Sequence, residues 1–186
     1  HSTNHTTHLG RFRAMANNPS PSQSPQEFDA IVIGAGFGGM YALHTLREQG
    51  LKVRAYDEAS GVGGTWYWNR YPGAQCDVES YIYLPLLEET GYMPSQKYAF
   101  QPEILEHAQR IGKHYDLYSR TYFQTQIREQ RWDDEAGQWV LTTNRGDVFR
   151  ARHVVVSSGS LNRPKLPGIP GLKSFKGHTF HTSRWD

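Results

Sequence analysis

The stretch FDAIVIGAGFGG, residues 28–39, decides the fold class of this chain. Its first half, residues 28–33, is a short apolar run of the kind that forms a strand buried in a parallel sheet. The glycines follow at once, and apolar residues at helical spacing then occupy 38–49, with Gly50 as a C-terminal cap. A second strand is expected at 52–56. The segment therefore predicts a β-α-β unit and an α/β fold.

The glycines form G-x-G-x-x-G, a pattern with a physical task at each position. Gly34 permits a tight turn, Gly36 lets the backbone approach a pyrophosphate, and Gly39 allows the helix to pack closely on the strand. Gly38 lies in the first turn of that helix, whose N-terminus offers free N–H groups to phosphates. Asp57 ends the second strand, where a carboxylate accepts hydrogen bonds from ribose hydroxyls and repels a 2′-phosphate. The β-α-β unit therefore predicts that the chain binds FAD or NAD rather than NADP. The alternative is that the glycine-rich turn serves packing alone and binds no cofactor.

The chain beyond this unit does not continue as alternating strands and helices. Residues 60–85 are rich in glycine and aromatic residues without periodicity, which predicts an ordered loop that contacts something. A helix is expected at 102–117, followed by strands at 121–132, 138–143 and 148–157 with short turn sequences between them. These three strands predict an antiparallel meander. This order is typical of flavoproteins with two dinucleotide-binding domains, and it favours FAD over NAD and a Rossmann-like FAD-binding domain.

Composition divides the chain into three parts. Residues 1–27 consist mostly of polar residues and proline and are expected to be a disordered arm. Residues 28–160 are expected to form the N-terminal part of the FAD-binding domain, and 161–186, rich in proline and glycine at first, a linker.

Several functional classes are disfavoured by composition. The net charge of +2 comes from 20 basic and 18 acidic residues without long runs, so we expect no nucleic-acid partner. The single cysteine, Cys76, rules out an internal disulfide and favours a reducing, cytoplasmic setting. No run approaches the roughly 18 apolar residues of a membrane span, so no membrane association is expected. The nine histidines lack a pattern that predicts a metal site.

Two further segments carry a resemblance to a known family. A first segment resembles the flavin loop of Baeyer–Villiger monooxygenases such as the cyclohexanone and phenylacetone enzymes: GGTWYWNRYPGA at 63–74, followed by Cys76, Asp77, Glu79, Ser80 and Tyr83. QPEIL at 101–105 is similar to another segment of those enzymes. The last twelve residues, FKGHTFHTSRWD, resemble the family fingerprint F-x-G-x-x-x-H-T-x-x-W-[P/D] at Phe175, Gly177, His181, Thr182, Trp185 and Asp186.

The resemblance implies a set of cofactor-binding residues. The glycine motif and Asp57 would bind the adenosine diphosphate of FAD, residues 65–68 and Tyr83 would line its flavin end, and Ile127 would touch the adenine through its backbone. Residues 75–77 would lie where the nicotinamide cofactor meets the flavin. The whole set is Gly34, Gly36, Gly38, Gly39, Asp57, Gly64, Thr65, Trp66, Tyr67, Trp68, Gln75, Cys76, Asp77, Tyr83 and Ile127.

The resemblance also implies an activity, the conversion of ketones to esters or lactones with O2, FAD and NADPH. Asp77 is the candidate catalytic residue, because it would hold and charge-balance an arginine that stabilises a negative flavin peroxide. A loop carboxylate that caps backbone N–H groups is the alternative for Asp77, and core filling is the alternative for the loop aromatics. His181 and Trp185 are expected to couple the two dinucleotide domains rather than to transfer protons.

Several parts of the family pattern do not occur in these 186 residues, including a second G-x-G-x-x-G for NADPH and the catalytic arginine. We therefore expect an N-terminal fragment that is inactive alone and whose partner is the remaining C-terminal portion. Two alternatives stay open: a non-catalytic FAD-binding module or complementing subunit of a split flavoprotein, and a flavin monooxygenase that oxygenates nitrogen or sulfur.

Overall fold

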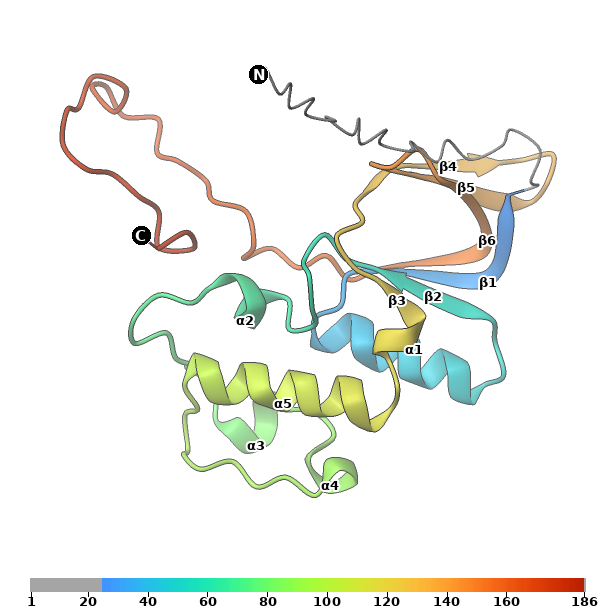
Figure 1. Ribbon diagram of the computed structural model, residues 1–186, viewed down its shortest axis with the longest axis horizontal. Helices are drawn as coiled ribbons and strands as arrows, with labels where there is room; N and C mark the ends of the chain where they lie inside the picture. Colours follow the sequence, from blue (N-terminus) through green and yellow to red (C-terminus); the bar gives the residue numbers. More distant parts are fainter. Residues whose placement is uncertain (1–24, 186) are drawn as a thin grey trace, which may run out of the picture.

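The computed structural model describes residues 25–185, which form a mixed sheet with helices against one face (Figure 1). The strands are β1 (Gln26–Ile33), β2 (Val53–Tyr56), β3 (Thr121–Tyr122), β4 (Ile127–Asp133), β5 (Gln138–Thr143) and β6 (Val148–Val156). The helices are α1 (Phe37–Glu48), α2 (Thr65–Trp68), α3 (Ser80–Tyr83), α4 (Leu87–Thr90) and α5 (Gln101–His114), with a 3-10 turn η1 at Tyr118–Arg120. The predicted α/β fold is confirmed.

The six strands lie in the order β3-β2-β1-β6-β5-β4. The first four are parallel, and β6 also pairs antiparallel with β5, which pairs antiparallel with β4. The long strand β6 thus belongs to both the parallel half and the antiparallel half of the sheet. Its apolar residues Val154 and Val155 pair with β1 at Ile31 and Val32, which places the glycine turn after β1 beside the end of β6.

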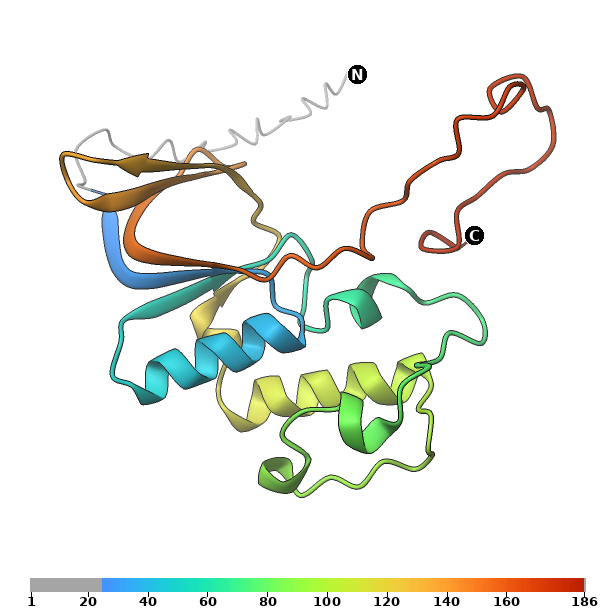
Figure 2. The same cartoon turned by 180° about the vertical axis from the view of Figure 1, so that it is seen from behind.

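Two apolar clusters hold these layers together. Helices α1 and α5 cover one face of the parallel strands, and Ala30, Val32, Met40, Leu43 and Ile111 are among the buried residues between them. The β4–β5 hairpin curls over the opposite face (Figure 2), where Phe28, Ile31, Tyr56, Leu141, Phe149 and Ala151 form a second cluster. The helices and the hairpin therefore leave the carboxyl ends of the parallel strands as the edge at which a site can form.

The predicted three-stranded antiparallel meander is present as β4, β5 and β6, but its first strand is shorter than expected. Its first segment, 121–132, divides into β3, which is parallel to β2, and β4. The break lies at Gln124, which adopts a left-handed backbone with φ of 51°. Its N–H donates to the Ala59 carbonyl at 2.8 Å, and the Thr125 N–H donates to the Asp57 carbonyl at 2.9 Å. Backbone groups that bond the loop after β2 cannot continue a strand ladder, so the chain crosses from one half of the sheet to the other here.

Smaller differences concern boundaries. The first strand begins at Gln26 rather than Phe28, because Gln26 already pairs with Phe149 of β6. The expected arm therefore loses its last two residues to the sheet, and residues 1–24 lie outside the described part of the chain. Within 60–85, expected to be a loop, α2 and α3 each form one turn, and the helix expected to end at 117 ends at His114.

The last segment, 161–185, carries no helix or strand, and it runs away from the sheet before returning toward α2 (Figure 1). None of the helices in the described residues combines the length and the hydropathy that a membrane crossing requires.

Candidate functional site

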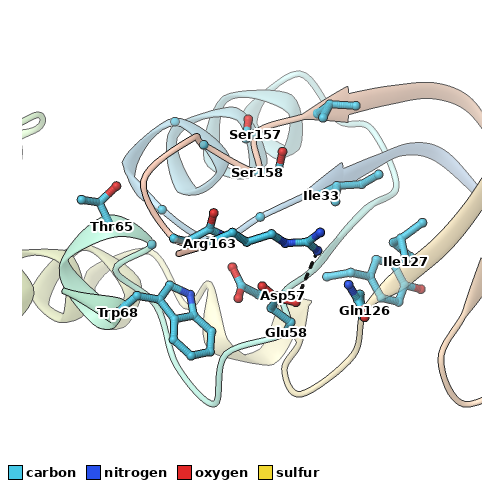
Figure 3. Close-up of a pocket in the computed structure, with 18 of the residues that line it drawn as sticks. Ile33, Asp57, Glu58, Thr65, Trp68, Gln126, Ile127, Ser157, Ser158 and Arg163 are labelled. Atoms are coloured by element: carbon cyan, nitrogen blue, oxygen red, sulfur yellow. Dashed lines mark ion pairs between the residues drawn. The ribbon is translucent and has the colours of Figure 1, made fainter. Parts of the chain in front are cut away.

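A cavity of about 750 Å³ opens at the carboxyl ends of β1, β2 and β6 (Figure 3). Its walls come from the β1–α1 turn, the residues after β2, α2, the start of β4 and the segment after β6. This is the edge at which α/β sheets bind ligands, and the volume lies in the range of small-molecule and cofactor sites. The predicted site residues that line it are Gly34, Gly36, Gly38, Asp57, Gly64, Thr65, Trp68, Tyr83 and Ile127.

The glycine turn is closely packed at two of its glycines. Gly34 has φ of 107°, and a Cβ on it would lie 2.3 Å from the carbonyl oxygen of Ser157. A Cβ on Gly39 would lie 1.8 Å from the Gly34 carbonyl oxygen. Gly39 does not line the cavity, so its role is to seat α1 on the turn. A Cβ on Gly38, by contrast, would meet only the Ser157 hydroxyl, at 3.9 Å.

The N-terminus of α1 forms one wall of the cavity. Within the described residues, no side chain caps this end, and the first turn of the helix contains no acidic residue. The first N–H groups of a helix have no partner inside the helix, and the helix dipole adds partial positive charge there. The uncapped end next to Gly36 and Gly38 is therefore a suitable site for the phosphates of a ligand.

Asp57 lies on the side of the glycine turn opposite the N-terminus of α1, and its side chain is buried, with 9% of the residue exposed. Its Oδ2 accepts a hydrogen bond from the Ala35 N–H at 2.5 Å, and its Oδ1 accepts one from the Ala59 N–H at 2.7 Å. Burial raises the pKa of this carboxyl, while the two amides oppose the rise. Each carboxylate oxygen keeps a second lone pair, so the side chain can still accept hydrogen bonds from a ligand hydroxyl.

The backbone at the start of β4 forms the wall beyond Asp57. Two hydrogen bonds between Gln126 and Asn144 hold this backbone in place. The Gln126 N–H donates to the Asn144 side chain and the Asn144 N–H donates to the Gln126 carbonyl, both at 2.9 Å. Ile127 follows directly and lies near Gln126 in Figure 3. This edge can contact a planar ring through backbone atoms.

Helix α2 forms the other end of the cavity. A Cβ on Gly64 would lie 2.8 Å from the Cα of Gly36, so the two glycine segments touch. Thr65 and Trp68 of α2 line the cavity, whereas Trp66 and Tyr67 do not.

The indole of Trp66 is buried, and its Nε1–H donates to the Tyr83 hydroxyl at 2.7 Å. Burial raises the pKa of the Tyr83 hydroxyl, and the hydrogen bond from Trp66 opposes this rise. The nearby Cys76 and Asp77 raise the pKa further. Tyr67 pairs with the Ser60 hydroxyl at 2.7 Å. Trp66 and Tyr67 therefore hold the loop in shape, while Trp68 and Tyr83 line the cavity.

Residues 75–77 lie outside the cavity. The side chain of Gln75 donates to the Tyr98 carbonyl at 2.8 Å, and the Cys76 N–H donates to the Ala99 carbonyl at 3.0 Å. Cys76 is buried with Trp66 and Ile104, whereas Asp77 is exposed. These two hydrogen bonds tie the loop to the segment before α5.

The segment after β6 also lines the cavity, although no residue of it was proposed from the sequence. Ser157 and Ser158 follow β6 at the edge shared with the glycine turn. Leu161, Asn162 and Arg163 come next, and Arg163 lies across the cavity in Figure 3, with its guanidinium 3.9 Å from the Glu58 carboxylate. The available signal was the sequence Ser157-Ser158-Gly159 directly after the apolar run of β6.

The fingerprint residues lie apart from the cavity. Phe175 is 62% exposed and Trp185 49% exposed, and Phe180 packs edge-on against Trp185. The His181 Nδ1 accepts a hydrogen bond from the Ser183 N–H at 3.1 Å, which closes a turn. Asp186 lies outside the described residues. Among residues 25–185, no group of three or more His, Cys, Asp or Glu side chains could hold a metal ion.

Comparisons with known proteins agree with this architecture. The family model of the pyridine nucleotide-disulphide oxidoreductases matches residues 28–185. Baeyer-Villiger monooxygenase 4 of Dietzia sp. is 56% identical over 162 residues, which cover 87% of this chain and 26% of that protein.

Two solved structures are similar as well. The cyclohexanone monooxygenase of Rhodococcus sp. Phi1, bound to NADP+, has a TM-score of 0.79 and 43% identity over 88% of this chain and 32% of its own. A crystal structure of OTEMO in complex with FAD and NADP has a TM-score of 0.81 and 36% identity over 88% of this chain and 31% of its own.

The fold and the cavity define a dinucleotide-binding α/β domain of the flavoprotein class. The chain belongs to the pyridine nucleotide-disulphide oxidoreductase family. The resemblance to Baeyer–Villiger monooxygenases is confirmed by the relatives and the solved structures. The chain spans about a third or less of the length of the curated relatives that it matches.

Proposed function

We propose that the cavity binds FAD by its adenosine diphosphate half. The observation that carries this proposal is the placement of an uncapped helix N-terminus and a buried carboxylate on two sides of one glycine turn. The first suits a pyrophosphate and the second suits ribose hydroxyls. The Asp57 carboxylate disfavours a 2′-phosphate at the same position, which argues against NADP here.

The remaining walls suit the two ends of the same molecule. The backbone at Ile127 would contact the adenine, and Thr65, Trp68 and Tyr83 would line the flavin end. Gly39, Trp66 and Tyr67 would act by positioning these walls rather than by touching FAD. Residues 28–160 would thus form the FAD-binding part, and 161–186 the connection to an NADPH domain.

The activity that we propose is Baeyer–Villiger oxidation, in which a ketone becomes an ester or lactone with O2 and NADPH. Bound FAD supplies the redox chemistry. Asp77, exposed near Tyr83, would hold an arginine contributed from outside these 186 residues, and His181 and Trp185 would couple the two domains. The names of the relatives favour this reaction over nitrogen or sulfur oxygenation. A cytoplasmic location remains a prediction from the single cysteine.

The 186 residues contain one G-x-G-x-x-G, so we expect ketone-dependent NADPH oxidation only when a second dinucleotide site is supplied. Ester formation by these residues alone, measured by gas chromatography, would refute that division.

The binding proposal is tested by titrating FAD into the chain and into an Asp57→Asn variant, with tryptophan fluorescence as the signal. We expect Asp57→Asn to weaken FAD binding by at least about tenfold, because a charged acceptor for the ribose is lost. The matched control is Asp134→Asn, an exposed aspartate on the β4–β5 turn, which should leave the affinity unchanged. Equal affinity in all three proteins would refute the role of Asp57.

A further inference from the structure

The segment Leu161–Arg163 crosses the cavity and is held at three consecutive residues; we call it the strap. The Leu161 carbonyl accepts a hydrogen bond from the Asn69 side chain at 2.9 Å. The Asn162 carbonyl accepts one from the Arg184 guanidinium at 3.1 Å, and Arg163 reaches Glu58. The strap is thus attached to the end of α2, to the fingerprint segment and to the loop after β2.

Arg184 makes a second contact with the cavity wall. Its guanidinium lies over the ring of Trp68, 4.7 Å from the ring centroid, and Trp68 lines the cavity. One side chain thus joins the strap to α2, from a position about twenty residues further along the chain. Arginine suits this task because a planar guanidinium stacks on an aromatic face while its N–H groups donate hydrogen bonds at its edge. Arg184 occupies a variable position of the fingerprint, so its role does not follow from the motif.

We propose that Arg184 is a positioning residue of the cofactor site, which holds the strap against Trp68 and so slows the release of the bound dinucleotide. The inference rests on the proposed function, since it takes FAD as the occupant of the cavity. The strap residues form part of the cavity wall, so a cofactor that leaves on this side must displace the strap. The contacts of Arg184 must break for that movement.

The position of Arg184 makes the proposal testable without unfolding the protein. Its side chain is exposed, and it belongs to a segment without helix or strand, outside the buried clusters. Substitution at such a site changes folding stability little. An effect on cofactor release would therefore come from the strap and not from loss of the fold.

The experiment measures FAD release from the full chain by the recovery of free flavin fluorescence after dilution. We expect Arg184→Ala to release FAD about tenfold faster, which corresponds to about 1.4 kcal/mol, because it loses the stacking contact with Trp68 and the charged hydrogen bond to Asn162. Arg184→Lys should be intermediate, since the ammonium keeps the charge without the planar fork. Arg110→Ala is the matched control, because Arg110 also stacks on an aromatic ring, that of Tyr92, but on α5 away from the cavity.

A readout without cofactor comes from trypsin. Lys165 is exposed and lies two residues beyond the strap, so we expect faster cleavage after Lys165 in Arg184→Ala than in the unsubstituted chain. Unchanged FAD release or unchanged cleavage in Arg184→Ala would refute the positioning role alone. Failure of the unsubstituted chain to bind FAD would refute the proposed function and, with it, this inference.

Discussion

Substitution of Gly39 by alanine should destabilise the protein strongly, because the helix α1 is seated on the carbonyl of Gly34. The added Cβ would lie 1.8 Å from that oxygen and 2.8 Å from its carbon. Ordinary contact between such atoms is about 3.5 Å, so α1 must retreat by about 1.7 Å from the turn. Both sides of the clash are backbone, and overpacking of this kind costs up to about 3 kcal/mol. The better helix propensity of alanine returns about 1 kcal/mol, which leaves a net loss of about 2 kcal/mol.

Gly38→Ala is the matched control, since Gly38 lies in the same helical turn and its Cβ would meet only the Ser157 hydroxyl at 3.9 Å. It should stabilise the fold by about 0.5 to 1 kcal/mol through helix propensity. Urea unfolding followed by far-ultraviolet circular dichroism gives both values. A Gly39→Ala protein as stable as the unsubstituted one, or an equal loss in both variants, would refute the packing argument.

The environments of His107, Tyr83 and Asp77 can each be tested by one substitution. Burial lowers the pKa of His107, whose Nε2–H donates to the Pro85 carbonyl at 2.7 Å. As the pH falls, the His107 imidazole is therefore protonated in the unfolded chain before it is protonated in the folded one. The free energy of unfolding should decrease as the pH drops below about 6.5. The urea midpoint of the unsubstituted chain should be lower at about pH 5.5 than at about pH 7.5, and this difference should be smaller in His107→Gln. The same difference in both proteins would contradict the role of His107. Tyr83→Phe removes the acceptor of the Trp66 Nε1–H and should lower the free energy of unfolding by about 1 to 2 kcal/mol in the same assay. The control Tyr81→Phe, at an exposed tyrosine, should lower it by less than about 0.5 kcal/mol. Asp77→Asn should change stability by less than about 0.5 kcal/mol because the side chain is exposed, and a larger loss would identify Asp77 as a structural cap of its loop.

The parts of the fold that sequence reasoning predicted are those with local signals. The β-α-β unit has an apolar strand, a glycine turn and a helical stripe within thirty residues, and the structure contains each of them. The two-residue strand β3 has no such signal, because it pairs with β2 more than sixty residues earlier. Its separation from β4 depends on backbone bonds of Gln124 and Thr125 to the loop after β2, which no periodicity reveals.

The same distinction applies to the site. The glycines and Asp57 follow from a motif with fixed spacing, and most of them line the cavity. The strap was missed because it reaches the cavity only through the parallel pairing of β6 with β1, a long-range contact. Gln75 was assigned to the cofactor by family resemblance, whereas in the structure its side chain bonds the Tyr98 carbonyl outside the cavity.

In the proposed function, the cavity binds FAD through its adenosine diphosphate half. Isothermal titration of the chain with FAD and with FMN tests it most directly, because FMN carries the same flavin without the adenosine. We expect that FAD binds, that ADP competes with it, and that FMN binds at least about a hundredfold more weakly, since the pyrophosphate, ribose and adenine contacts are absent. Equal binding of FAD and FMN, or no competition by ADP, would contradict it.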